Sequence, residues 1–275
     1  IPSYFGVGAP AANLGKVDSH GFELAVRLNK QWTSDFRTSL NFNMTHAKNK
    51  VKFADDPELR AAYLKGEGYA INQTRSYLDH GYIRTWDELY GSPVVESNND
   101  SKFMGDYQII DFNADGKITS EDSAPYKYSS IPQNTYSTTF QAEWKGLSLT
   151  LQFYGVTNVT RQVQFPTFQR EAHVAFKEGD YYNVIANNGE LPLPRWVTIT
   201  DNSANGTRYY YDGSFLRLKN AELAYTFHGD WLKRAHLNGL RIYLNGDNLL
   251  LWTKMPDDRE NNFSGGDGAY PTVRR

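Results

Sequence analysis

Apolar and polar side chains alternate along six stretches of the chain. Such alternation predicts β-strands, because successive side chains of a strand point to opposite faces. In the first stretch, for example, Phe22, Leu24, Val26 and Leu28 share one face. The fifth stretch changes the parity of its apolar face near Asn220, which predicts a β-bulge at that point. The six stretches are residues 21–29, 36–44, 136–144, 147–154, 215–227 and 240–251.

Helical patterns are scarce in the sequence. Residues 57–64 follow two aspartates that are suitable as caps, and they predict a short helix within a loop. Residues 230–234 predict a single helical turn. Neither segment is long enough to build a helical core, so we predict an all-β fold.

The connections between the predicted strands alternate strictly between short and long. Short turns lie near residues 33–34, at 145–146 and between 229 and 239. Long connections cover about 48–133, 156–214 and 253–275. A meander with this asymmetry is typical of transmembrane antiparallel β-barrels, which have short periplasmic turns and long extracellular loops. Trp32 and Trp144 lie beside short turns, where a girdle of aromatic side chains would meet the lipid interface.

A soluble antiparallel sandwich would show the same alternation, so the pattern alone leaves that alternative open. Two observations favour the membrane. All the long connections share one side, and the polar faces carry charges that a water-filled lumen tolerates. Those charged residues are Glu23, Arg27, Arg37, Glu143, Arg217, Lys219 and Arg241. Six strands cannot enclose a wide lumen, so a barrel interpretation implies that further strands are needed.

Composition excludes several classes of protein. The 275 residues carry 29 basic and 31 acidic side chains, a balance that gives no reason to expect nucleic acid as a partner. Mean hydropathy is −0.62, which excludes a helical membrane protein. Without cysteine there are no disulfides and no thiol chemistry. The chain begins Ile1–Pro2 without a signal peptide, and we expect it to be an interior piece of a longer protein.

Residues 111–122 match the pattern of a calcium-binding loop, in which oxygen ligands recur at alternate positions around a glycine turn. The pattern predicts a structural calcium ion, with the backbone carbonyl of Lys117 among the ligands. The alternative is a turn rich in Asp and Asn that never holds a metal. The predicted ligands are Asp111, Asn113, Asp115, Lys117 and Asp122.

No catalytic motif is present, so we predict that the chain is not an enzyme. The histidines lack metal-binding spacing, and the sequence contains neither a serine elbow nor a phosphate-binding loop. The predicted loops are instead rich in aromatic rings, which can stack on sugars or on a partner, or simply pack the loops. Our candidates for substrate contact are Trp196, Tyr209, Tyr210 and Tyr211.

Several segments together resemble the SusC/RagA family of TonB-linked outer-membrane transporters of Bacteroidetes. These segments are Asn13–Leu24, Gly105–Asp122 with Ile131–Pro132, the hairpin around Trp144–Leu149, Ser214–Asn220, Leu240–Leu249 with Trp252–Lys254, and Tyr270–Arg274. The resemblance spans nearly the whole chain apart from its variable loops. It implies a barrel of about 22 strands with an internal plug domain, of which these residues form the C-terminal portion. The plug and the final strand are absent from this sequence.

The resemblance implies import across the bacterial outer membrane, with TonB supplying energy through the missing N-terminal region. A SusD-like surface lipoprotein would cover the extracellular mouth. The cargo would be a nutrient oligomer, first a glycan and second a peptide. The alternative function is a soluble, secreted, aromatic-rich β protein that binds carbohydrate without transporting it.

Overall fold

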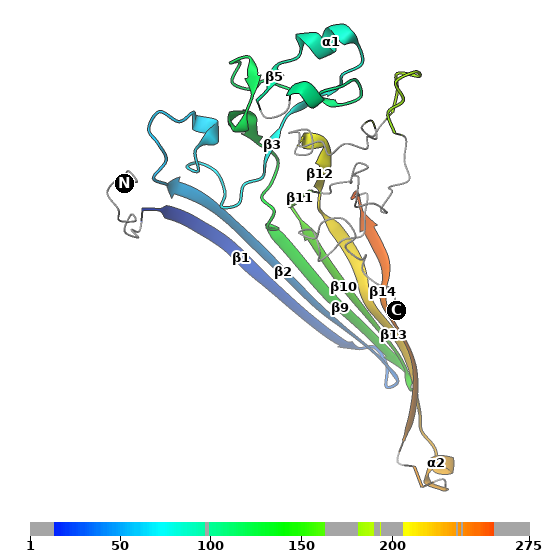
Figure 1. Ribbon diagram of the computed structural model, residues 1–275. Helices are drawn as coiled ribbons and strands as arrows, with labels where there is room; N and C mark the ends of the chain where they lie inside the picture. Colours follow the sequence, from blue (N-terminus) through cyan, green and yellow to red (C-terminus); the bar gives the residue numbers. More distant parts are fainter. Residues whose placement is uncertain are drawn as a thin grey trace, which may run out of the picture.

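The computed structural model describes residues 14–96, 99–162, 181–189, 193, 206–234, 236–237 and 239–255. Within these residues, six long strands form one antiparallel sheet in which neighbours in space are neighbours along the meander (Figure 1). All six predicted strands are confirmed. They are β1 (Lys16–Gln31), β2 (Phe36–Phe53), β9 (Asn134–Trp144), β10 (Leu147–Thr157), β13 (Phe215–Phe227) and β14 (Leu240–Thr253).

The predicted asymmetry of the connections is also present. The turns at 32–35 and 145–146 and the described residues between β13 and β14 gather at one end of the sheet, which we call the short-turn end (Figure 1). The described residues of the connections 54–133 and 158–214 lie at the opposite end, which we call the loop end. Because β2 continues to Phe53, the first long connection begins later than the sequence pattern predicted.

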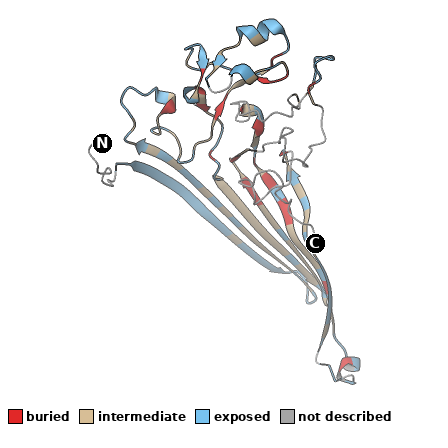
Figure 2. Cartoon of the chain, in the orientation of Figure 1, coloured by how far each residue is buried: buried red, intermediate tan, exposed pale blue. Residues whose placement is uncertain are grey.

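Except near the loop end of β1 and β2, where outward positions hold His20, Lys48 and Lys50, each strand of the sheet has a mainly apolar outward face and a polar inward face. The strand register aligns apolar side chains in rows across the sheet, since Leu28 pairs with Leu40 and Leu40 with Phe140. The described strands form a single layer, and many outward side chains stay exposed although they are apolar (Figures 1 and 2). These include Phe22, Leu24, Leu28, Leu147, Leu223, Ile242, Leu244, Leu250 and Trp252. The sandwich alternative requires a second sheet packed on these rows, and the described residues supply none.

The bulge predicted near Asn220 is confirmed at Lys219. The pairing of β13 with β10 and β14 resumes at Asn220 after Leu218, so Lys219 has no Cα partner in either ladder. This extra residue moves the apolar face from even positions before it to odd positions after it. On the β14 side, Asn248 adopts a left-handed φ of 54° beside the irregularity.

The turn between β9 and β10 needs its glycine. Lys145 and Gly146 both have positive φ, 46° and 87°, as a two-residue type I′ hairpin requires. A Cβ at Gly146 would lie 2.6 Å from the backbone oxygen of Thr226. The neighbouring strand β13 therefore passes too close to this turn for any side chain at position 146.

The long connections contain short paired strands of their own. The first holds β3 (Arg75–Tyr77), β4 (Asp79–Tyr82), β5 (Val94–Val95), β6 (Tyr107–Ile109), β7 (Lys117–Ile118) and β8 (Ser123–Pro125). The second holds β11 (Thr160–Gln162) and β12 (Tyr210–Asp212), which pair with each other. Three-residue 3₁₀ turns complete them at Ala62–Leu64, Asn99–Ser101, Ser120–Asp122 and Thr207–Tyr209.

The helix predictions were partly right. α2 (Asp230–Arg234) is the expected single turn at the short-turn end. The helix predicted over 57–64 was wrong, since only Ala62–Leu64 form a 3₁₀ turn. The helix α1 (Trp86–Gly91), which begins at a capping box between Thr85 and Glu88, was not predicted from the sequence. None of the described helices has the length and apolarity to cross a membrane.

Introducing a charged side chain on the outward face tests whether that face contacts lipid or water. We expect Leu151→Arg on β10 to lower the free energy of unfolding in lipid by about 2–4 kcal/mol, the cost of arginine at the middle of a bilayer. Thr150→Arg, the neighbouring inward position on the same strand, is the control and should cost less than about 1 kcal/mol. Urea titration of the full-length protein in lipid measures both values, and equal effects would contradict the assignment of the two faces.

Candidate functional site

The inward face of the sheet is a wall of paired polar side chains. Arg37 on β2 donates to one carboxylate oxygen of Glu143 on β9 from Nη2 at 2.6 Å and from Nε at 2.9 Å. Two residues further on, Ser39 donates to Gln141 at 3.1 Å. On the same face, near the β14 edge of the sheet, Arg241 pairs with Glu222 between β14 and β13. The charged residues that the sequence placed in a lumen are thus partly neutralised across strands.

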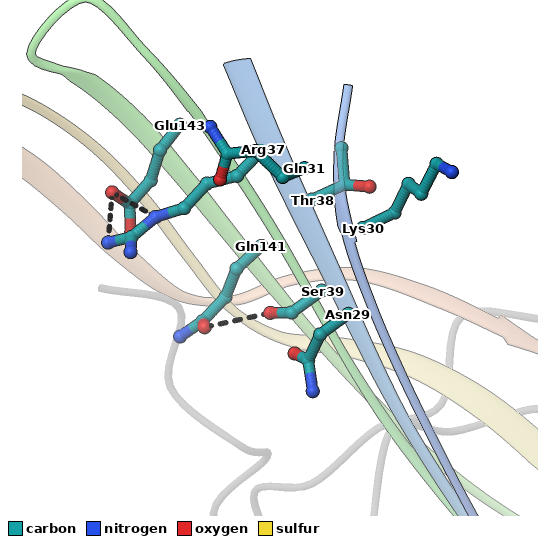
Figure 3. A pocket seen from close by; sticks show the side chains of 8 residues that line it. All are labelled: Asn29, Lys30, Gln31, Arg37, Thr38, Ser39, Gln141 and Glu143. Carbon is teal, nitrogen blue, oxygen red and sulfur yellow. Dashed lines mark hydrogen bonds and ion pairs between the residues drawn. The ribbon is translucent and has the colours of Figure 1, made fainter. Parts of the chain in front are cut away.

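Near the short-turn end this wall borders a hollow of about 560 Å³ (Figure 3). Asn29 and Gln31 on β1 line it together with the Arg37–Glu143 and Ser39–Gln141 pairs. Lys30 and Thr38 also border it, and their side chains point to the other side of the sheet (Figure 3). A surface of amides, hydroxyls and a compensated ion pair suits neutral ligands that form hydrogen bonds.

At the loop end, four buried tyrosines hold the two long connections together. Tyr82 and Tyr107 stack with ring centroids 4.8 Å apart, and the Tyr82 hydroxyl donates to that of Tyr107 at 3.3 Å. Tyr182 and Tyr209 join the same cluster from the second connection, each packing on one of these rings. Burial raises the pKa of Tyr107 far above its ordinary value, so its phenol stays protonated.

Asp79 fastens the second connection to the first. One carboxylate oxygen accepts the Thr207 hydroxyl at 2.6 Å and the Arg208 backbone amide at 3.0 Å. The guanidinium of Arg208 then lies over the rings of Tyr82 and Tyr107, 4.8 and 5.0 Å from their centroids. We call Asp79, Thr207 and Arg208 the loop clamp. It joins residues that are almost 130 positions apart in sequence.

The predicted substrate contacts differ in their exposure. Tyr209 is buried in the tyrosine cluster, so its ring packs the loops. Tyr210 and Tyr211 are half-buried on β12, and burial raises the pKa of each phenol. Tyr211 packs on the apolar cluster at the base of the loops around Val156 and Phe215. Trp196 lies outside the described residues.

The calcium-like loop is closed by hydrogen bonds from its own backbone. Asp122 is fully buried, and its carboxylate accepts the amides of Phe112 and Thr119, both at 2.8 Å, and that of Asn113 at 3.3 Å. Asp122 thus ties the end of the loop to its start.

The other predicted side-chain ligands likewise accept backbone amides within the loop. Asp111 accepts from Gly116 at 2.6 Å, Asn113 from Asp115 at 3.0 Å, and Asp115 from Lys117 at 2.8 Å. In the described part of the chain, no group of three or more His, Asp or Glu side chains is placed to hold a metal. A calcium ion here would depend on Asp111, Asn113, Asp115 and the Lys117 carbonyl, and its presence stays a prediction.

Sequence reasoning missed the loop clamp. Asp79 lies in a polar stretch and Arg208 beside three tyrosines, and neither position has a spacing that reveals the other. The residues of the cross-strand pairs were easier to predict from the sequence, since the alternation placed them on one face. Only the register then decided which of them meet.

Comparisons with known proteins agree with this architecture. The chain is 25% identical to TonB-dependent receptor P3 of Formosa agariphila over 305 residues, covering 100% of this chain and 29% of that protein. TonB-dependent receptor P26 of the same organism is also 25% identical, over 302 residues, with coverage of 100% and 30%. No family model matches the chain.

Solved structures of the RagAB peptide importer share the fold. The open-open state matches with a TM-score of 0.59 and 17% identity, covering 93% of this chain and 27% of the solved chain. The closed-closed state gives 0.59 and 18%, with coverage of 93% and 28%. The chain thus spans less than a third of the proteins it matches. The predicted resemblance, the partial antiparallel barrel and the outer-membrane localisation are confirmed.

The loop clamp predicts coupled protection of the two connections. Asp79→Ala removes the acceptor of two hydrogen bonds and leaves their donors unpaired, at a cost of about 1–3 kcal/mol. We expect faster hydrogen exchange across residues 206–212, measured by mass spectrometry on the full-length protein. Asp100→Ala, an exposed aspartate of the same connection, is the control. Unchanged exchange at 206–212 would show that other contacts hold the second connection.

Proposed function

Because this chain is similar along its whole length to TonB-dependent receptors, we propose that it forms part of the wall and mouth of an outer-membrane nutrient importer. The observation that carries the proposal is the single-layer sheet, apolar and exposed on one face and polar and cross-paired on the other. A water-filled lumen inside a bilayer requires this division. The relatives are named as receptors and importers, which agrees with the expectation that the chain is not an enzyme.

The proposal assigns three tasks to these residues. The outward rows contact lipid, the inward pairs line the path, and the loop end receives the cargo. Energy would come from TonB through a plug domain outside these residues. A SusD-like surface lipoprotein would close over the loop end, where the clamp makes two connections into one receiving surface.

For the cargo, we propose a neutral oligosaccharide first and a peptide second. The half-buried rings of Tyr210 and Tyr211 suit the apolar faces of sugars, and the amides and hydroxyls of the inward wall suit their hydroxyl groups. A specific observation favours the peptide alternative, because the solved structures with the same fold are of a peptide importer. Both cargoes demand the same machinery.

Uptake by cells tests the function and the cargo together. A strain that depends on the full-length protein is given fluorescent neutral oligosaccharides or fluorescent peptides, with and without functional TonB. We expect TonB-dependent accumulation of the oligosaccharides. Accumulation of peptides alone would decide for the second cargo, and accumulation of neither class would overturn the importer proposal.

The tyrosines of β12 have a matched test in the same assay. Replacing Tyr210 and Tyr211 together with alanine should lower uptake about tenfold, since each aromatic contact contributes about 0.5–1.5 kcal/mol. Tyr90→Ala on α1 removes an equally large and more exposed ring, and we expect uptake to be unchanged. Equal losses of uptake in the two variants would contradict a specific role of the β12 tyrosines in binding cargo.

We propose calcium binding at residues 111–122 as a separate property. Since the carboxylates already accept backbone amides, we expect weak binding, with a Kd of about 10⁻⁴–10⁻³ M as in extracellular modules. Calorimetric titration of the full-length protein with Ca²⁺ measures it, and Asp115→Asn should abolish the heat. Asp122→Asn should destabilise the loop both with and without calcium. A titration without heat at millimolar Ca²⁺ would identify the loop as a metal-free turn.

A further inference from the structure

Lys30 is a cation on the face of the sheet that contacts lipid. It pairs across the sheet with Thr38, and Thr38 pairs with Ala142, all on the outward side. Figure 3 shows Lys30 and Thr38 pointing away from the inward group of Asn29, Arg37 and Gln141. Trp32 lies on this outward side as well, because its indole Nε1 donates to the Thr38 hydroxyl at 2.9 Å.

The depth of Lys30 makes it unusual. It lies two residues, about 6.6 Å, further from the turn than Trp32, on the side of the hydrocarbon. The next outward row contains Leu28, Leu40 and Phe140, which are all apolar. An ammonium among such side chains is costly unless its flexible stem carries it back to the interface. The side chain does turn back, since Nζ lies 5.6 Å from the centroid of the Trp32 ring.

The neighbouring hairpin repeats the same arrangement. Lys145 places its Nζ 5.9 Å from the centroid of the Trp144 ring. The two hairpins are tied together, because the Lys145 amide donates to the Asp35 carbonyl at 3.2 Å and Phe36 pairs with Trp144. The tryptophans are thus two strand spacings apart, about 10 Å along the belt. Two lysine–indole pairs thus lie on adjacent hairpins at the short-turn end.

The charges at this position do not cancel. Asp35 lies 3.8 Å from Lys145, and no ion pair of Lys30 is found among the described contacts. Glu143 is nearby along the strand, but it faces inward and is bonded to Arg37. One carboxylate against two ammonium groups leaves a net positive charge at the boundary between apolar rows and water.

We propose that Lys30 and Lys145, with Trp32 and Trp144, bind the phosphate of a phospholipid in the leaflet at the short-turn end. The ammonium groups contact the phosphate, the indoles pack at the level of the glycerol, and the acyl chains lie along Leu28, Leu40 and Phe140. The inference rests on the proposed placement of the sheet in a bilayer. It adds a lipid site that import itself does not require.

Lipid retention tests the site. The full-length protein is stripped of lipid in detergent and mixed with dioleoyl phosphatidylglycerol, and bound lipid is counted by native mass spectrometry. We expect the double variant Lys30→Met, Lys145→Met to retain at least fivefold less lipid than the parent. Lys127→Met is the matched control and should retain the parental amount. Lys127 also follows an aromatic residue, has φ of 46° and lies over a ring, that of Tyr126, but at the loop end.

Three further ligands identify the chemical group that binds. Dioleoyl phosphatidylethanolamine should bind to the parent and be lost from the double variant, because it carries the same phosphate. Dioleoylglycerol, which lacks phosphate, should bind equally weakly to both. Inorganic phosphate should not displace the lipid, since it lacks acyl chains.

Either of two results overturns the site. One is parental retention of lipid by the double variant, and the other is equal retention of dioleoylglycerol and phosphatidylglycerol by the parent. Sugar or peptide uptake in the same variants separates the two proposals. Normal uptake and normal lipid retention by the double variant would contradict the lipid site alone. If neither the parent nor any variant retained lipid or took up cargo, the importer proposal would be contradicted.

Discussion

The backbone hydrogen bonding of the six-stranded meander is the constraint on which the rest depends. Lipid offers no partner for an amide or a carbonyl, so each strand must satisfy its backbone groups on its neighbours. Antiparallel pairing meets this demand for the four inner strands, apart from the bulge at Lys219, and it fixes which face each side chain occupies. The apolar rows, the inward ion pairs and the lysines over their indoles all follow from this one register.

The outlines of the sheet could be predicted because alternation is a local property. Each strand displays its own two faces in its own sequence, and even the bulge left a trace when the apolar parity changed beside Lys219. Helices of one or two turns carry far less local information. Residues 57–64 had a favourable composition, yet only Ala62–Leu64 form a turn of 3₁₀ helix, whereas α1 depended on the reciprocal capping of Thr85 and Glu88.

The candidate site was harder to predict, because it is made by contacts between distant segments. Nothing near Asp79 indicates that its acceptor oxygens hold Thr207 and Arg208. The run of tyrosines at 209–211 indicated an aromatic surface, yet Tyr209 is buried while its two neighbours remain half-exposed. In Asp122 the sequence shows a carboxylate at the right position for a ligand, but only the fold shows the three amides that it accepts.

The bulge at Lys219 divides β13 into two segments, and residues of the same parity face opposite sides of the sheet in the two segments. Toward the loop end, even positions such as Leu216 and Leu218 face outward, and Arg217 faces inward and is buried. Toward the short-turn end, odd positions such as Leu223 and Tyr225 face outward instead. A polar substitution at an odd position therefore faces inward before Lys219 but outward after it. Substitutions designed for the inward face of β13 must therefore use odd positions before residue 219 and even positions after it.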